Sequence, residues 1–157
     1  MKEIKIPSLD FDKFKLVDTN TGEVVEYSLK DELGINRETY QLDFINQPAK
    51  YVYWQAVLQN LKTYEESVQR SSDIQHAHSY NYAYNYLKTK AKVTRPTKDM
   101  IESIIMRDKD YQQTLEKVEE AKENVGIVNA IVKAYEQRRD MLIQLGADER
   151  LSKQNSN

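Results

Sequence analysis

The sequence predicts a mainly α-helical protein: a long antiparallel helical hairpin that oligomerises and carries a small N-terminal β-hairpin. Only four of its 157 residues are glycine and three are proline, while 31% are charged, and this composition favours long solvated helices. The mean hydropathy of -0.78 indicates little apolar surface for a monomeric core. A stripe buried between subunits would supply the missing stability.

The first 35 residues form the predicted β-hairpin appendage. Residues 14–18 and 23–27 are β-leaning runs, and they flank the turn-forming stretch 19–22, Thr-Asn-Thr-Gly. Because a lone hairpin is marginal in water, the alternative is a ribbon that only packs on the helices. Residues 28–34 follow as one or two helical turns that end at Gly34.

Residues 36–151 form the predicted helical domain for oligomerisation and single-strand binding. A short helix reaches residue 46, and a long one runs from Pro48 to about Lys92 without another glycine or proline. Pro96 breaks the chain, Thr97 caps a second long helix, and Gly146 ends it. A second apolar line on that helix, through residues 127, 131 and 134, predicts a surface for another subunit. The polar tail 152–157 is expected to be disordered.

Composition also narrows the function classes. The absence of cysteine excludes disulfides, thiolate nucleophiles and cysteine metal sites. No apolar run approaches the roughly 20 residues of a membrane span, and the N-terminus lacks the apolar core of a secretory signal. We therefore expect a protein of the cytoplasm that does not contact membranes.

Charge is unevenly distributed although the net charge is only -2. No acidic residue lies between Asp73 and Asp99, whereas acids make up about a sixth of the chain. The same window holds five cations, Lys88, Lys90, Lys92, Arg95 and Lys98. A concentrated cationic stretch in an acidic protein suits contact with a polyanion without indiscriminate binding.

Four tyrosines at positions 80, 82, 84 and 86 precede these cations. Aromatic rings beside lysines suit a single strand, because unpaired bases stack on rings while ammonium groups contact phosphates. Since the four rings cannot share one helix face, Tyr82 and Tyr86 are the predicted stacking residues, and some of the tyrosines are expected in the core. The alternative is that the tyrosines fill a helix interface and the lysines form a solvated face.

No catalytic or metal-binding motif is visible. His76 and His78 are two residues apart, which does not suit joint metal binding from a helix. Asp108 and Asp110 resemble an acidic pair, but solvated charge or helix capping accounts for them. There is no Walker loop, dinucleotide fingerprint or nucleophile elbow. We therefore predict a protein that is not an enzyme and that needs no metal or cofactor.

One stretch of the chain resembles a known family. Residues 86–91, Tyr-Leu-Lys-Thr-Lys-Ala, end a long helix, and after a break residues 107–110, Arg-Asp-Lys-Asp, open a helix with a basic pair, Arg138 and Arg139, near its end. This order, over residues 54–150, resembles recombination mediators of the UvsY type from T-even bacteriophages. The family's basic motif falls on Lys88 and Lys90, and lysine replaces arginine at the second position, which keeps charge but loses planar stacking.

The resemblance implies a hexameric or heptameric homo-oligomer that binds single-stranded DNA in the host cytoplasm. It implies a role in phage DNA recombination and repair, helping to load a RecA-like recombinase in place of the single-strand-binding protein. The N-terminal 35 residues lie outside the resemblance. The competing interpretation is a coiled-coil adaptor or phage structural protein without nucleic-acid binding.

Overall fold

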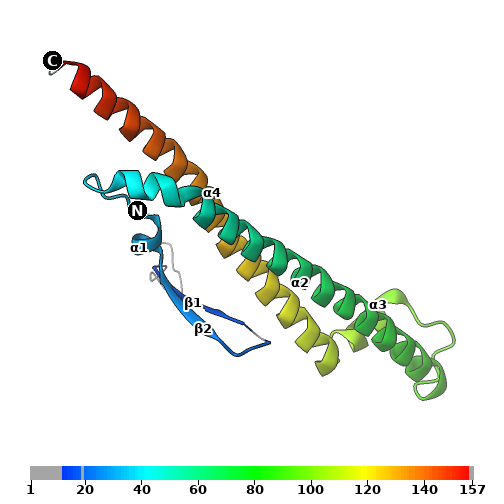
Figure 1. Ribbon diagram of the computed structural model, residues 1–157. Helices are drawn as coiled ribbons and strands as arrows, with labels where there is room; N and C mark the ends of the chain where they lie inside the picture. Colours follow the sequence, from blue (N-terminus) through cyan, green and yellow to red (C-terminus); the bar gives the residue numbers. More distant parts are fainter. Residues whose placement is uncertain (1–11, 19, 156–157) are drawn as a thin grey trace, which may run out of the picture. The chain divides into compact units, whose positions relative to one another are not determined.

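The computed structural model describes residues 12–18 and 20–155 (Figure 1). In chain order its elements are β1 Lys13–Val17, β2 Val24–Ser28, α1 Leu29–Leu33, α2 Tyr40–Thr89, α3 Lys98–Ile105 and α4 Lys109–Asn155. This confirms the predicted fold class of a long helix pair with a small two-stranded sheet. The chain divides into two compact units, and both long helices contribute to each. Unit 1 comprises residues 1–51 and 133–157, and unit 2 comprises Val52–Val132.

The N-terminal hairpin in unit 1 is antiparallel, with Lys15 opposite Glu26 and Phe14 opposite Tyr27. The first pair forms an ion pair at 2.7 Å, and the second stacks its rings at 5.5 Å between centroids. At the turn, Asp18 accepts hydrogen bonds from backbone N–H groups through its side chain. Gly22 has a φ of 75°, a conformation that glycine adopts without a steric penalty.

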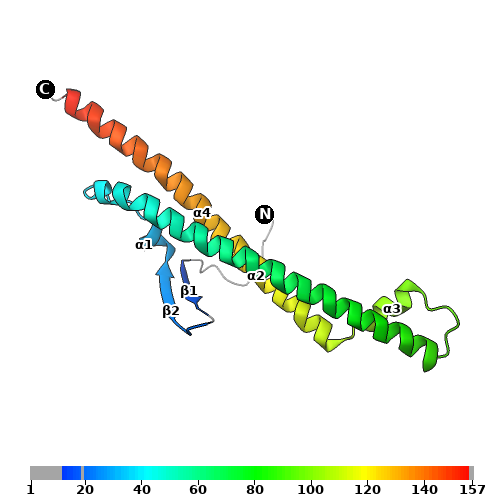
Figure 2. The same cartoon turned by 45° about the vertical axis from the view of Figure 1, so that its right-hand side comes forward.

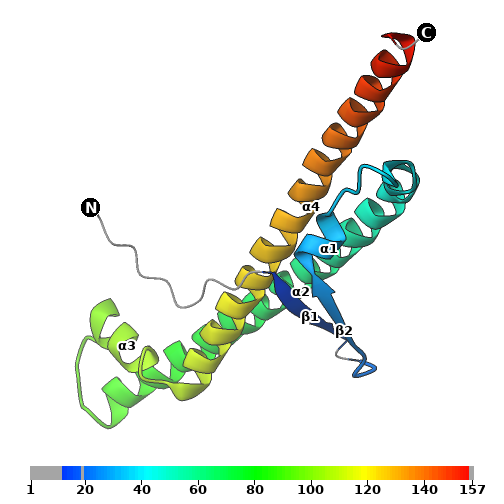
Figure 3. The ribbon, with the colours of Figure 1, turned by 90° about the vertical axis from the view of Figure 1, so that its left-hand side faces the viewer.

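Helix α1 lies beside α4 (Figure 3), and a buried arginine joins it to the long helices of unit 1. The Arg138 guanidinium donates hydrogen bonds to the carbonyls of Leu33 and Gly34, to Gln47 Oε1 and to the Asp43 carboxylate. Gly34 is required here, because an added Cβ would lie 2.8 Å from a backbone oxygen. One side chain from α4 therefore holds the backbone at the end of α1 in place.

In unit 1 the start of α2 lies antiparallel to the later part of α4 (Figure 2). Tyr40 hydrogen-bonds Glu149, and seven residues further along α2 the Gln47 side chain donates to the Tyr135 carbonyl at 2.7 Å. Residue numbers thus rise along one helix as they fall along the other. Among the described residues, the buried side chains of unit 1 are Gln47, Tyr135, Arg138 and Leu142.

Unit 2 repeats the antiparallel pairing with a more apolar interior. Thr114 donates to Ser72 at 3.3 Å, and Asp108 accepts from Ser79. The buried apolar side chains come from α2, α3 and α4, and they are Trp54, Leu58, Ala83, Leu87, Ile101, Ile105, Val118, Ala121, Val128, Ile131 and Val132. Because Ile131 is buried within the chain, the predicted apolar line through residues 127, 131 and 134 is not a continuous free surface.

Several element boundaries differ from the prediction. Helix α2 is continuous from Tyr40, so Pro48 lies inside it and the predicted separate short helix is absent. The predicted second helix is two helices, because the Asp108 side chain caps a new one by accepting from the Asp110 N–H. Helix α4 then passes through Gly146 to Asn155, which includes four residues of the tail predicted to be disordered.

None of the helices in the described ranges has the continuous apolar length that a bilayer crossing requires.

Candidate nucleic-acid interface

The last turns of α2 bury a line of small and aliphatic residues at a spacing of four. Ser79, Ala83 and Leu87 are all buried, at 4%, 0% and 6% exposure. Ala83 and Leu87 of this line pack on Ile101 and Ile105 of α3, which lies beside the end of α2 in Figure 1. The buried line sets the rotation of the helix, and so it decides where the tyrosines point.

The four tyrosines flank the buried line and do not enter it. Tyr82 is 67% exposed and Tyr86 is 44% exposed, while Tyr80 and Tyr84 are 39% and 36% exposed. The expectation that some of them form core is therefore wrong. A spacing of two in the sequence places alternate tyrosines on opposite flanks of the buried line, since each residue turns the helix by about 100°.

The predicted stacking pair, Tyr82 and Tyr86, lies together on one flank. The two rings are nearly parallel, at 21°, and their centroids are 6.3 Å apart. Two parallel exposed rings one helical turn apart offer flat apolar surface to unpaired bases.

The other flank carries an interaction that the sequence interpretation missed. The Lys88 ammonium lies 5.2 Å from the centroid of the Tyr84 ring, at a distance typical of a cation–π contact. The spacing of four between these residues on a helix was the available signal. The contact holds the Lys88 charge at the surface and occupies one face of the Tyr84 ring.

Lys90, Lys92 and Arg95 lie in the exposed loop between α2 and α3. Lys92 has a φ of 54°, the left-handed conformation that helix ends usually assign to glycine. The next residue, Val93, donates its N–H to the Leu87 carbonyl at 2.9 Å and packs on the apolar cluster. This contact fixes the start of the loop.

Helix α3 closes the loop and presents the last predicted cation. Thr97 caps it by accepting from the Met100 N–H, and Lys98 is its first residue. Figure 3 shows α3 turned back beside α2. Ile101 and Ile105 anchor the helix, so the loop is held at both ends.

The five predicted cations are all exposed, and none forms an ion pair with any residue in the described part of the chain. We call residues 82–98, which contain no acid, the basic segment. In the structure, acids from other elements lie close to the first residues of the acid-free window. Glu102 lies 3.5 Å from His76, and Asp108 hydrogen-bonds Ser79, so acids reach its first part. The segment from Tyr82 onward keeps an unopposed positive charge.

Asp108, which hydrogen-bonds Ser79 on α2, has a structural role. The hydroxyl of Ser79 lowers the pKa of its carboxyl below the usual value of 3.8, and the backbone N–H groups at residues 110 and 111 add to this effect. Burial opposes the shift. A carboxylate at a helix N-terminus also interacts favourably with the positive end of the helix dipole. This position confirms the capping role predicted for Asp108.

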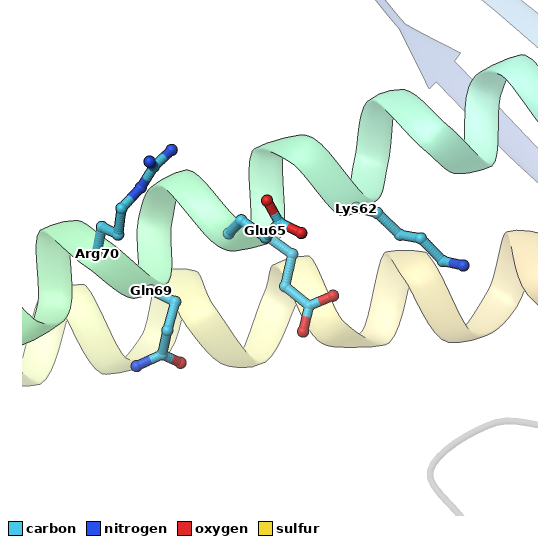
Figure 4. Close-up of a pocket in the computed structure, with 5 residues that line it drawn as sticks. Lys62, Glu65, Gln69 and Arg70 are labelled. Carbon is cyan, nitrogen blue, oxygen red and sulfur yellow. The ribbon is translucent and has the colours of Figure 1, made fainter.

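The acidic and histidine side chains within residues 12–18 and 20–155 form no metal site. No three His, Asp or Glu side chains converge there to hold a metal ion. A shallow hollow on α2 is lined by Lys62, Glu65, Glu66, Gln69 and Arg70. In Figure 4 the labelled side chains of this hollow point in different directions, and Arg70 and Gln69 leave opposite sides of the helix. Such an arrangement does not converge on a ligand.

Arg138 and Arg139, the basic pair of the family resemblance, have different surroundings. Arg138 is 4% exposed and is committed to its buried hydrogen bonds. Arg139 pairs with the neighbouring Asp140 at 2.9 Å. Both charges are thus engaged within unit 1.

Comparisons with protein-family models, with curated proteins and with solved structures found no match for this chain.

Proposed function

We propose that this chain is a non-enzymatic, self-associating protein that binds single-stranded nucleic acid through the basic segment. One observation carries the proposal. Five exposed cations without ion-pair partners in the described residues follow two exposed, nearly parallel tyrosine rings. Phosphates would neutralise the cations, and unpaired bases would stack on Tyr82 and Tyr86.

The geometry favours single strands over duplex. In a duplex the base faces are stacked on each other, so exposed tyrosine rings gain nothing from them. Lysines contact phosphates of either form without reading sequence. Stacking therefore supplies the difference in affinity between single strand and duplex. The cations supply most of the salt dependence of binding to either form.

Within this proposal the biological role is that of a recombination mediator in a phage-infected cell. The resemblance of residues 54–150 to the UvsY-type mediators supports it, and the partners would be single-stranded DNA, a RecA-like recombinase and the single-strand-binding protein. A homo-oligomer that repeats the basic segment would gain avidity along one strand even when each subunit binds weakly. Such a mediator holds the strand for recombinase nucleation and needs no hydrolysis.

A structural adaptor without nucleic-acid binding is the second candidate. Large apolar side chains exposed on the long helices favour it, among them Ile74 and Ile127 at 60% and 45% exposure. Such side chains mark surfaces for other proteins when they form patches. The adaptor and the mediator differ in one property, the binding of oligonucleotides.

Fluorescence anisotropy with a labelled oligonucleotide, as single strand and as duplex, tests the proposal. We expect the single strand to bind more tightly at every salt concentration, with an affinity that falls as salt rises. Equal affinity for both forms would remove the stacking role of the tyrosines. No binding of either form at low salt would leave the adaptor as the function.

A further inference from the structure

Two more exposed tyrosines lie on the flank of α2 that carries Tyr82 and Tyr86. Tyr53 and Tyr64 are 45% and 53% exposed, and they precede the basic segment on the same continuous helix of unit 2 (Figure 2). Because each residue turns the helix by about 100°, Tyr64 has the same rotation as Tyr82, five turns later. Tyr53 and Tyr86 differ from Tyr82 by only about 20° and 40°. We call these four residues the tyrosine stripe.

The buried residues of α2 show that the helix keeps its rotation over this length. Trp54 and Ser72 have the same spacing as Tyr64 and Tyr82, and they are 1% and 2% exposed. Leu87, near the end of the helix, is buried as well. Since the inward face holds its direction from residue 54 to residue 87, the flank that carries the stripe does so too.

The surroundings of the tyrosine stripe suit a polyanion. Within residues 53–86 the acids of α2 all lie about 100° or more from the rotation of Tyr64 and Tyr82, and they are Glu65, Glu66 and Asp73. The exposed residues within about 40° of that rotation are polar, and they are Asn60, Ser71 and His78. Nothing on the stripe therefore repels phosphates, and its rings are open to bases.

We infer that a single strand held by the basic segment continues along α2 and stacks further bases on Tyr64 and Tyr53. This inference rests on the proposed function and extends its site, because the stripe leads directly into the basic segment. Tyr64 lies about 27 Å from Tyr82 along the helix axis. A strand stacked at about 3.4 Å per nucleotide spans that distance in about eight nucleotides. The preferred ligand is thus a strand longer than about eight nucleotides.

The stripe contributes by stacking and not by charge. Within residues 53–86 the cations of α2, Lys62 and Arg70, lie about 120° or more from the rotation of Tyr64 and Tyr82. Loss of a stripe ring should therefore change the affinity and leave its salt dependence unchanged. Tyr64 is a better residue to test than Tyr53, because Tyr53 also makes an edge contact with the buried Trp54 ring at 5.5 Å.

The test compares Tyr64→Ala with the control Tyr80→Ala. Tyr80 is 39% exposed and is closer to the basic segment, but it lies about 160° from the rotation of the stripe. Anisotropy measures the affinity of each variant for single strands of about four and about twenty nucleotides. Tyr64→Ala should weaken binding of the long strand at least about fivefold and leave the short strand unaffected. Tyr80→Ala should change the affinities for both lengths by the same factor.

Two further measurements separate stacking from packing. Tyr64→Phe keeps the ring and should bind the long strand as the wild type does. Ultraviolet crosslinking of the wild type to the long strand should modify Tyr64, and crosslinks confined to the basic segment would overturn the inference. A lower melting temperature for Tyr64→Ala, with unchanged affinity, would assign the ring to packing and overturn it as well.

Failure of the stripe is distinguishable from failure of the proposed function. If Tyr82→Ala weakens binding of the long strand and Tyr64→Ala does not, the inference is wrong and the basic segment remains the binding site. If the wild type binds neither strand at low salt, both are wrong.

Discussion

The lysines and arginines that pair with acids and the cations of the basic segment lie in different units of the molecule. In unit 1, Lys15, Lys50, Arg138, Arg139 and Lys153 each pair with an acid. In unit 2 the basic segment has no acid, and its cations have no ion-pair partner among the described residues. Arg138 and Lys50 pair with acids of other elements and hold those elements together, whereas the exposed cations of the basic segment remain available to a polyanion. Charge alone therefore does not identify a binding residue, and its surroundings do.

The substitution with the largest expected effect removes Arg138, a cation that is paired inside the chain. Arg138→Ala should destabilise unit 1 by about 3 to 5 kcal/mol, because Asp43, Gln47 and two backbone carbonyls lose their partner. Thermal unfolding followed by circular dichroism measures the loss. Arg139→Ala is the matched control, and it should leave the melting temperature unchanged, since that side chain is exposed. Equal effects for both variants would mean that the buried network does not stabilise unit 1.

The stacking surface is expected to give the next largest effect. Tyr82→Ala should weaken oligonucleotide binding by about 1 to 3 kcal/mol for each subunit engaged, with an unchanged salt slope and melting temperature. Tyr80→Ala removes a tyrosine from the opposite flank and should have a smaller effect. Anisotropy titrations and thermal melts of both variants separate these outcomes. A fall in melting temperature for Tyr82→Ala, without a change in affinity, would assign the ring to packing.

Helix capping in unit 2 provides a test that depends on pH. Asp108→Ala should cost about 1 kcal/mol at pH 7, because the first turn of α4 loses its cap. The folded state lowers the pKa of this carboxyl, so its contribution is present above the usual value of 3.8 and is lost as the pH falls through the lower folded pKa. Melts of the two proteins should therefore converge below about pH 3.8. A difference that persists unchanged in acid would contradict the capping charge.

The smallest effect concerns the left-handed residue of the loop. Lys92→Gly should stabilise the protein by up to about 1 kcal/mol, since glycine adopts the φ of 54° without strain. The same variant loses one cation and should bind oligonucleotides slightly less tightly. Melting and binding would thus change in opposite directions, as measured by calorimetry and anisotropy. A variant that melts lower than the wild type would show that the Lys92 side chain has a structural role.

The sequence was sufficient for the architecture because its signals were local. The hairpin turn, the Thr97 cap and the helical periodicity each depend on neighbouring residues, and all three are present in the structure. The break before α4 was missed because no glycine or proline marks residues 106–108. There the interruption comes from the Asp108 cap, which is a local contact, and from burial of Ile101 and Ile105, which is a tertiary effect.

The candidate site was predictable by residue type but not by orientation. The spacing Ser79, Ala83, Leu87 marks the buried line, and it would have placed the tyrosines on its flanks. Likewise Arg138 lies three residues after Tyr135 and four before Leu142, in phase with buried positions. From the sequence alone, an arginine at such a position is predicted to be an exposed charge. The partners that allow Arg138 to be buried are 91 to 105 residues away in the sequence.

The central claim is that the basic segment binds nucleic acid because its cations are exposed and lie in a stretch of the chain without acids. The most direct measurement compares Lys88→Ala/Lys90→Ala with Lys117→Ala/Lys122→Ala, two double variants with the same change in net charge. The control lysines are exposed on α4 among the six acids of residues 108–123. Single-strand affinity is measured for each protein across a salt series, with helicity and oligomer mass as controls for folding.

We expect the Lys88/Lys90 variant to bind more weakly at low salt. The log-log salt slope should fall by about 0.7 for each phosphate contact that is lost. The Lys117/Lys122 variant should keep the slope of the wild type. If the Lys88/Lys90 variant instead binds as tightly as the wild type at the same salt, the basic segment is a solvated surface and the proposed function is wrong.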